Sequence, residues 1–127
     1  MIFHPPPHVS VHLAGSTAPR QARRVVKGLL VRAEKVEWHD NAELVVSEIV
    51  ANAIAACGAC DLSAWYLESD RALRVEVTDT SPALPVPQPV SSTRVGGHGL
   101  RIVERLSSRW GVIQQPGSKT VWFEVDG

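Results

Sequence analysis

The segment 42–56 consists almost wholly of Ala, Leu, Val and Ile, interrupted only by Glu43, Ser47, Glu48 and Asn52. Asp40 lies just before this segment, and Glu43 lies three residues after Asp40. This is the spacing of a capping box, so we predict a helix from Asp40 to about Ala56. A helix that is apolar on every side is normally buried. The rest of the chain must therefore fold around this helix.

The length and composition fit one folded domain. The chain has 127 residues, of which 44% are hydrophobic and 20% are charged. A chain of this length buries roughly two thirds of its unfolded surface and needs no disulfide framework. These fractions exclude a disordered tail and a fibrous protein. We expect a single domain over residues 1–127, with residues 1–8 as a flexible lead-in.

Charge and hydropathy exclude several classes of partner. Thirteen basic and thirteen acidic residues cancel, so little general attraction to nucleic acid or anionic lipid is expected. No apolar stretch approaches the roughly 20 residues of a membrane helix, and the first residues lack the pattern of a signal peptide. We therefore expect a cytoplasmic protein that binds neither nucleic acid nor membranes directly. Packing in the core and at its edges is expected for Trp38, Trp65, Trp110 and Trp122.

The remaining periodicities predict an α+β fold. Alternating apolar and polar residues indicate strands, and apolar residues at helical spacing indicate two further helices, the first capped by Ser16 or Thr17. This order is typical of a two-layer sandwich in which three helices cover one face of a mostly antiparallel, mixed sheet. The predicted strands are 9–13, 62–68, 73–78, 110–113 and 120–125, and the two further helices are 17–33 and 100–106.

A long connection interrupts this order at residues 81–97. It contains four prolines and ends in Gly96 and Gly97, so it can form neither a helix nor a central strand. A connection of this length inside a small domain is more often a functional loop or lid than a simple turn. We expect it to act as a lid.

Glu48 and Asn52 are the first candidate functional pair. They are four residues apart on a helix, so they lie on one face roughly 40° apart. One interpretation is structural: Glu48 meets a core arginine and Asn52 caps a neighbouring backbone segment. The other is a ligand pocket, in which Glu48 deprotonates a hydroxyl or water and the Asn52 carbonyl oxygen binds a hard cation such as Mg²⁺.

Asp79 and the glycines before the last helix are further candidates. Asp79 directly follows a strand, where it either opens a turn or accepts a hydrogen bond from an exocyclic amine such as that of adenine. The sequence Gly-Gly-His-Gly-Leu at residues 96–100 enters a helix. It is either a plain hinge or a site where backbone amides meet phosphate.

In this order, these motifs resemble the ATP-binding domain of the GHKL (Bergerat-fold) superfamily, which gyrase, heat-shock chaperone ATPases, histidine kinases and MutL share. Within that superfamily the chain is most similar to the small actinobacterial anti-sigma-factor serine/threonine kinases. The resemblance extends from about residue 9 to residue 125. It rests on an asparagine box at 43–53, an adenine-binding box at 75–82, a glycine box at 97–103 and a closing strand at 117–123.

The resemblance implies roles for individual residues. Glu48 would be the general base, Asn52 the Mg²⁺ ligand and Asp79 the residue that reads adenine. Thr120 would support the adenine pocket, and the loop 86–96 corresponds to the ATP lid. The other residues implied at the nucleotide are Pro82 of the adenine-binding box and the phosphate-binding Gly97, His98, Gly99 and Leu100.

The resemblance also implies a function. The chain would bind ATP and Mg²⁺, phosphorylate a serine or threonine of a STAS-type anti-anti-sigma protein, and hold a sigma factor. Dimers are common among the proteins it resembles, and the apolar edge at residues 9–13 would suit a homodimer. The family pattern is not followed at Ser81-Pro82, Ala55-Ala56 and His98. The alternative is therefore a module that binds nucleotide weakly, or not at all, and sequesters a partner.

Cys57 and Cys60 have the spacing of half a zinc site or of a dithiol couple. No second ligand pair accompanies them, and they follow the end of a helix rather than its beginning, where a thiolate would be stabilised. We interpret them as two ordinary thiols around a C-cap at Gly58. A redox sensor and an intermolecular metal site are the alternatives.

Overall fold

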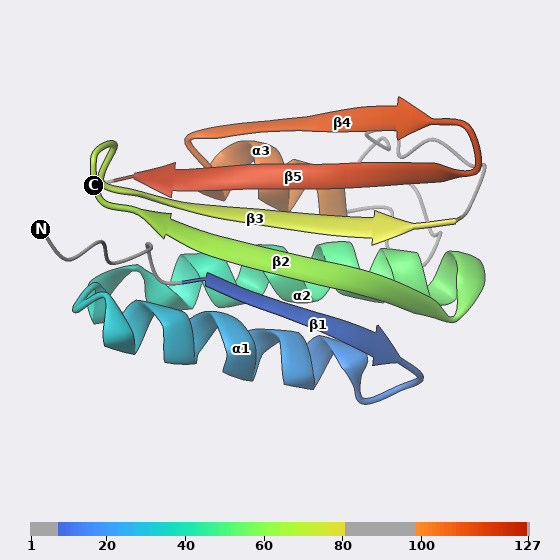
Figure 1. The fold of residues 1–127 in the computed structure, drawn as a ribbon, viewed down its shortest axis with the longest axis horizontal. Coiled ribbons are helices and arrows are strands. Elements are labelled where there is room, and N and C mark those ends of the chain that lie inside the picture. Colours follow the sequence, from blue (N-terminus) through green and yellow to red (C-terminus); the bar gives the residue numbers. More distant parts are fainter. Residues whose placement is uncertain (1–7, 81–98, 127) are drawn as a thin grey trace, which may run out of the picture.

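The strands pair in the order β1, β2, β3, β5, β4, and all of these pairings are antiparallel (Figure 1). The structure is a computed structural model that describes residues 8–80 and 99–126, so residues 1–7 of the predicted lead-in and the predicted lid at 81–97 lie outside the described residues. The elements are β1 (His8–Ala14), α1 (Ala18–Arg32), the 3₁₀ turn η1 (Val36–Trp38), α2 (His39–Cys57), β2 (Ala59–Leu67), β3 (Ala72–Asp79), α3 (Gly99–Leu106), β4 (Arg109–Gln115) and β5 (Ser118–Asp126).

The three helices lie on one face of this sheet, which confirms the predicted α+β two-layer class (Figure 1). The sequence predicted a mostly antiparallel, mixed sheet, and no parallel pairing occurs among the strands of the described part. The first strand begins at His8, which the sequence placed in the lead-in. Within residues 8–80 and 99–126, no helix combines the length and apolar character needed to span a bilayer.

Strict alternation of side chains gives the sheet its covered inner face. Along β3 and β5 every second residue is buried, and the residues between them are half-buried. Because successive strand residues point to opposite faces, the buried set faces the helices. Phe123 on β5 is the largest side chain that is fully buried. The inner face is therefore the floor of the core.

Helix α2 occupies the middle of the helical layer, between α1 and α3 (Figure 1). Its buried side chains include Val45, Val46, Ile49 and Val50, as its apolar character predicted. It ends where Gly58 adopts a left-handed conformation with φ of 82°, which confirms the predicted C-cap.

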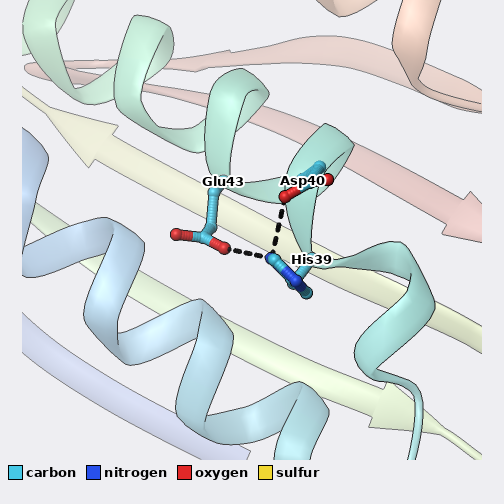
Figure 2. A group of neighbouring side chains, drawn as sticks. All are labelled: His39, Asp40 and Glu43. Atoms are coloured by element: carbon cyan, nitrogen blue, oxygen red, sulfur yellow. Dashed lines mark hydrogen bonds and ion pairs between the residues drawn. The ribbon is translucent and has the colours of Figure 1, made fainter.

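The predicted N-cap position of α1 is confirmed at Thr17, whereas the capping box predicted for α2 is wrong. Thr17 is the N-cap of α1 but makes no side-chain hydrogen bond to it. Helix α2 begins at His39, one residue earlier than predicted, so Trp38 is its N-cap. Glu43 binds the His39 ring instead, with 2.7 Å between Oε2 and Nδ1, and Asp40 lies 3.1 Å from the same nitrogen (Figure 2). This imidazole engages the carboxylate that a capping box would require.

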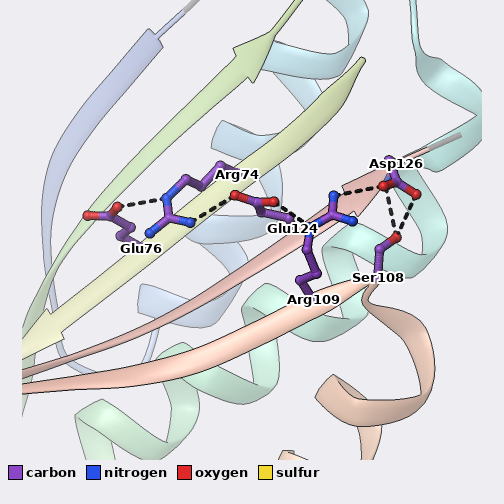
Figure 3. Close-up of polar contacts among 6 residues, drawn as sticks. All are labelled: Arg74, Glu76, Ser108, Arg109, Glu124 and Asp126. Atoms are coloured by element: carbon purple, nitrogen blue, oxygen red, sulfur yellow. Dashed lines mark hydrogen bonds and ion pairs between the residues drawn. The ribbon is translucent and has the colours of Figure 1, made fainter. Parts of the chain in front are cut away.

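A chain of ion pairs ties β3, β5 and β4 together on the outer face (Figure 3). Arg74 bridges Glu76 and Glu124, and Arg109 bridges Glu124 and Asp126, with N···O distances of 2.7–2.9 Å. Burial alone would raise the pKa of Glu124, but hydrogen bonds from Arg109 and Arg74 lower it below its ordinary value. These ion pairs therefore connect neighbouring strands of the sheet.

The tryptophans pack as the sequence predicted. Trp122 lies under the Arg74 guanidinium, whose carbon is 4.4 Å from the ring centroid, and Trp65 stacks on His8. A Cβ atom at Gly111 would come within 2.8 Å of the Trp122 indole nitrogen, so this close approach requires glycine. Trp38 and Trp110 pack against the core.

Candidate functional site

A row of polar side chains crosses the inner face at the end of β3. Register pairs Leu13 with Cys60, Asp79 with Lys119, and Lys119 with Gln114. Asp61 on β2 pairs with Thr78 on β3. Cys60 comes directly before Asp61 and Asp79 directly after Thr78, so Cys60 and Asp79 lie opposite each other and belong to the same row. Within the part of the chain that the structure describes, Asp79 and Lys119 are the two buried charged residues, with exposed fractions of 5% and 7%.

Lys119 faces Asp79 across β3 and β5. Its Nζ lies 3.8 Å from Oδ1 of Asp79, and both side chains are almost completely covered. Two charges buried together in this way are costly to desolvate, so the pair is unusual in a core that is otherwise apolar. We therefore take this end of the sheet as the candidate site.

Thr120 was predicted to support the adenine pocket, but the residue that faces Asp79 across the strands is Lys119, which the motifs did not single out. Thr120 points to the outer face, where its Oγ1 lies 2.7 Å from Oγ1 of Thr78. The structure therefore separates Thr120 from Asp79 by the thickness of the sheet. The alternation of Lys119 with the buried Val121 and Phe123 was the signal that could have identified the lysine.

Glu48 and Asn52 lie one turn apart on α2, and both side chains are half-buried. No hydrogen bond or ion pair joins either of them to another residue in 8–80 or 99–126, so the core arginine and the backbone cap of the structural interpretation are not seen there. Helix α2 packs on β3 and runs in the same direction (Figure 1). Asn52 therefore lies nearer than Glu48 to the end of the molecule that holds Asp79.

Helix α3 begins at this same end of the molecule. It starts at Gly99, with Leu100 as its second residue. From its last residue the chain continues into β4, away from the end of β3 (Figure 1). The free amides of its first turn are thus oriented toward the end of β3. The other residues predicted at the nucleotide, Pro82, Gly97 and His98, lie outside the described residues.

The two cysteines differ sharply in environment. Cys57 is exposed at the end of α2, and its Sγ donates to the carbonyl oxygen of Ala59 at 3.0 Å. Cys60 is buried in the polar row. Burial, and then the negative charge of Asp79, raise the pKa of the Cys60 thiol to about 11. Both cysteines are free thiols, as predicted.

We expect only one of these thiols to react with Ellman's reagent in the folded protein at pH 8. With a pKa of about 11, only about 0.1% of Cys60 is thiolate at that pH, and its sulfur is covered. The second thiol should react on unfolding, or as the pH approaches 11. Substitution Cys57→Ser should remove the fast reaction. Rapid labelling of both thiols in the native state would show that the end of β2 opens.

Comparisons with known proteins bear on the family and the fold. The sequence matches the family model of the histidine kinase-like ATPase domain over residues 14–125. No curated protein matches the chain. The fold is similar to the crystal structure of the RsbU and RsbW domains of Rv1364c from Mycobacterium tuberculosis, with a TM-score of 0.70 and 21% sequence identity.

The structural match covers 96% of this chain and 33% of the other, so the chain spans about a third of the length of its structural relative. At this identity the similarity shows a shared fold. The family model covers most of the chain, including the predicted asparagine box and closing strand. An ATPase domain binds a nucleotide, and both Asp79 and Lys119 lie within the matched range. The chain therefore belongs to the family of histidine kinase-like ATPase domains.

Proposed function

We propose that the chain binds Mg-ATP and is an anti-sigma-factor-like serine/threonine kinase that phosphorylates a STAS-type antagonist and holds a sigma factor. The observation that carries this proposal is the buried carboxylate of Asp79 at the end of β3, on the face covered by α2. It is supported by the ATPase family and by the structural relative, which contains an RsbW domain.

Asp79 is proposed to read the base. A buried carboxylate accepts a hydrogen bond from an exocyclic amine and disfavours a base that offers a carbonyl oxygen there. Its neighbours on the inner face of β3, Val77 and Val75, are apolar and buried. A base held at Asp79 would therefore lie next to the apolar core.

Asn52 is proposed to hold Mg²⁺. Its amide oxygen is a hard donor, and the side chain is half-buried without a partner in the described part of the chain. One such ligand suits an ion that keeps several waters and takes its other ligands from substrate phosphates. Mg²⁺ at this position supplies positive charge to the phosphates of the nucleotide.

Glu48 is proposed as the general base. It lies one turn before Asn52 on the same face of α2, where its carboxylate accepts the proton of the substrate hydroxyl. The first turn of α3 is proposed to stabilise negative charge on the phosphates through its free amides. The proposed functional groups thus come from α2, from the first turn of α3 and from the end of β3.

Titration calorimetry with ATP tests the nucleotide site. We expect ATP to bind, and its affinity to fall when Mg²⁺ is chelated. In Asn52→Ala, the affinity for ATP in the presence of Mg²⁺ should fall by about tenfold or more, and chelation of Mg²⁺ should then have little further effect. The matched control is Asn41→Ala, an exposed asparagine in the first turn of the same helix, which should bind as the unaltered protein does. Absence of binding at millimolar Mg-ATP would leave the partner-sequestering module as the function.

A further inference from the structure

We propose that Lys119 is a second base-reading residue, whose ammonium donates a hydrogen bond to ring nitrogen N1 of adenine while Asp79 accepts one from the exocyclic amine. This inference rests on the proposed function, because it assumes that adenine binds at Asp79. Lys119 lies in the predicted closing strand at 117–123, but the resemblance gives it no role.

The position of Lys119 is fixed by the sheet. It is the register partner of Asp79, so the two side chains leave adjacent strands side by side on the inner face. The N···O distance of 3.8 Å is longer than the 2.7–3.2 Å of a hydrogen bond. At this distance the ammonium and the carboxylate form an ion pair.

The chemistry of this pair matches one edge of adenine. The exocyclic amine of adenine is a donor, and N1, bonded to the same ring carbon, is an acceptor. A carboxylate and an ammonium side by side present the complementary acceptor and donor. Hypoxanthine offers these groups in the reverse order, with a carbonyl oxygen where adenine has its amine, so its carbonyl would face the carboxylate. The pair thus discriminates between purines at two adjacent atoms rather than at one.

A purely structural role makes a different prediction. A buried ion pair contributes little net stability over an apolar pair of the same size, although the loss of one partner is costly. If Lys119 only neutralised Asp79, its substitution would lower stability, and the effect on nucleotide binding would not depend on the N1 atom. The atom at position 1 of the purine therefore separates the two roles.

The test compares three triphosphates on the unaltered protein by calorimetry: ATP, 1-deaza-ATP, which lacks the N1 acceptor, and purine riboside triphosphate, which lacks the exocyclic amine. A hydrogen bond to a charged group contributes about 1.5–3 kcal/mol, so each analogue should bind roughly 10- to 100-fold more weakly than ATP. In Lys119→Met, ATP should weaken by a similar factor, and 1-deaza-ATP should bind as well as ATP does. The preference for the exocyclic amine should persist.

The control for the lost charge is Lys27→Met, an exposed lysine of α1, which should retain the whole pattern. Equal binding of ATP and 1-deaza-ATP to the unaltered protein, with purine riboside triphosphate still weaker, would overturn the role of Lys119 and leave the proposed function intact. No binding of ATP would overturn both. If Lys119→Met fails to fold, the three nucleotides on the unaltered protein still decide.

Discussion

Substitution Glu48→Gln is expected to slow phosphate transfer by at least about 100-fold, because a positioned general base contributes roughly 10²–10⁴ to the rate. ATP affinity should change by less than about twofold, since the glutamine keeps the size of a side chain that is not proposed to bind the base or the ion. The measurement is transfer of labelled γ-phosphate from ATP to a STAS-domain protein from the same organism, with calorimetry for the affinity.

The control for this experiment is Glu43→Gln on the same helix. Glu43 is also half-buried, but its carboxylate engages His39 near the beginning of α2, away from the end that holds Asp79 (Figure 2). Transfer should therefore proceed at its ordinary rate in this variant. Equal rates for Glu48→Gln and the unaltered protein would remove Glu48 from the chemistry and leave it as a surface residue of α2.

Substitution Asp79→Asn is expected to weaken ATP binding by roughly 10- to 100-fold, because the exocyclic amine loses a charged acceptor. It should also lower the free energy of unfolding by about 3 kcal/mol, because Lys119 would keep its buried charge and lose the carboxylate beside it. Chemical denaturation measures the second effect, and calorimetry on the folded protein without denaturant measures the first.

The matched control for Asp79 is Asp61→Asn. Asp61 lies on β2 next to Cys60, but on the outer face, where its Oδ1 is 2.8 Å from Nδ1 of His12 and its side chain is 69% exposed. Exposed ion pairs contribute little, so both affinity and stability should stay close to those of the unaltered protein. A loss of stability in Asp79→Asn with unchanged ATP affinity would make the Asp79–Lys119 pair purely structural.

The periodic parts of the fold could be predicted from the sequence because burial imposes them. The strands and helices lie within a few residues of their predicted bounds, since apolar residues at spacings of two and of three to four leave few alternatives. The capping box failed for a local reason. A histidine next to Asp40 extends α2 by one residue and binds Glu43, and no pattern of residue types encodes that competition.

The candidate site could be predicted only where it is local. Glu48 and Asn52 share a helix, so their spacing alone places them on one face. Lys119 and Asp79 are brought together by pairing between strands about forty residues apart, and a shift of one residue exchanges Lys119 for Thr120. The motif predicted Thr120 at the adenine pocket, whereas the pairing of β3 with β5 places Lys119 opposite Asp79. Register depends on the whole sheet, which local spacing does not specify.

The place of β5 between β3 and β4 has a consequence for biosynthesis. Among the described strands this one leaves the ribosome last, yet it inserts into the middle of the sheet rather than extending its rim. Until β5 docks, Asp79 lacks its register partner Lys119. If these two residues read the base as proposed, a nascent chain recognises ATP only after translation has passed β5, and ATP added during synthesis stabilises only chains that already contain this strand.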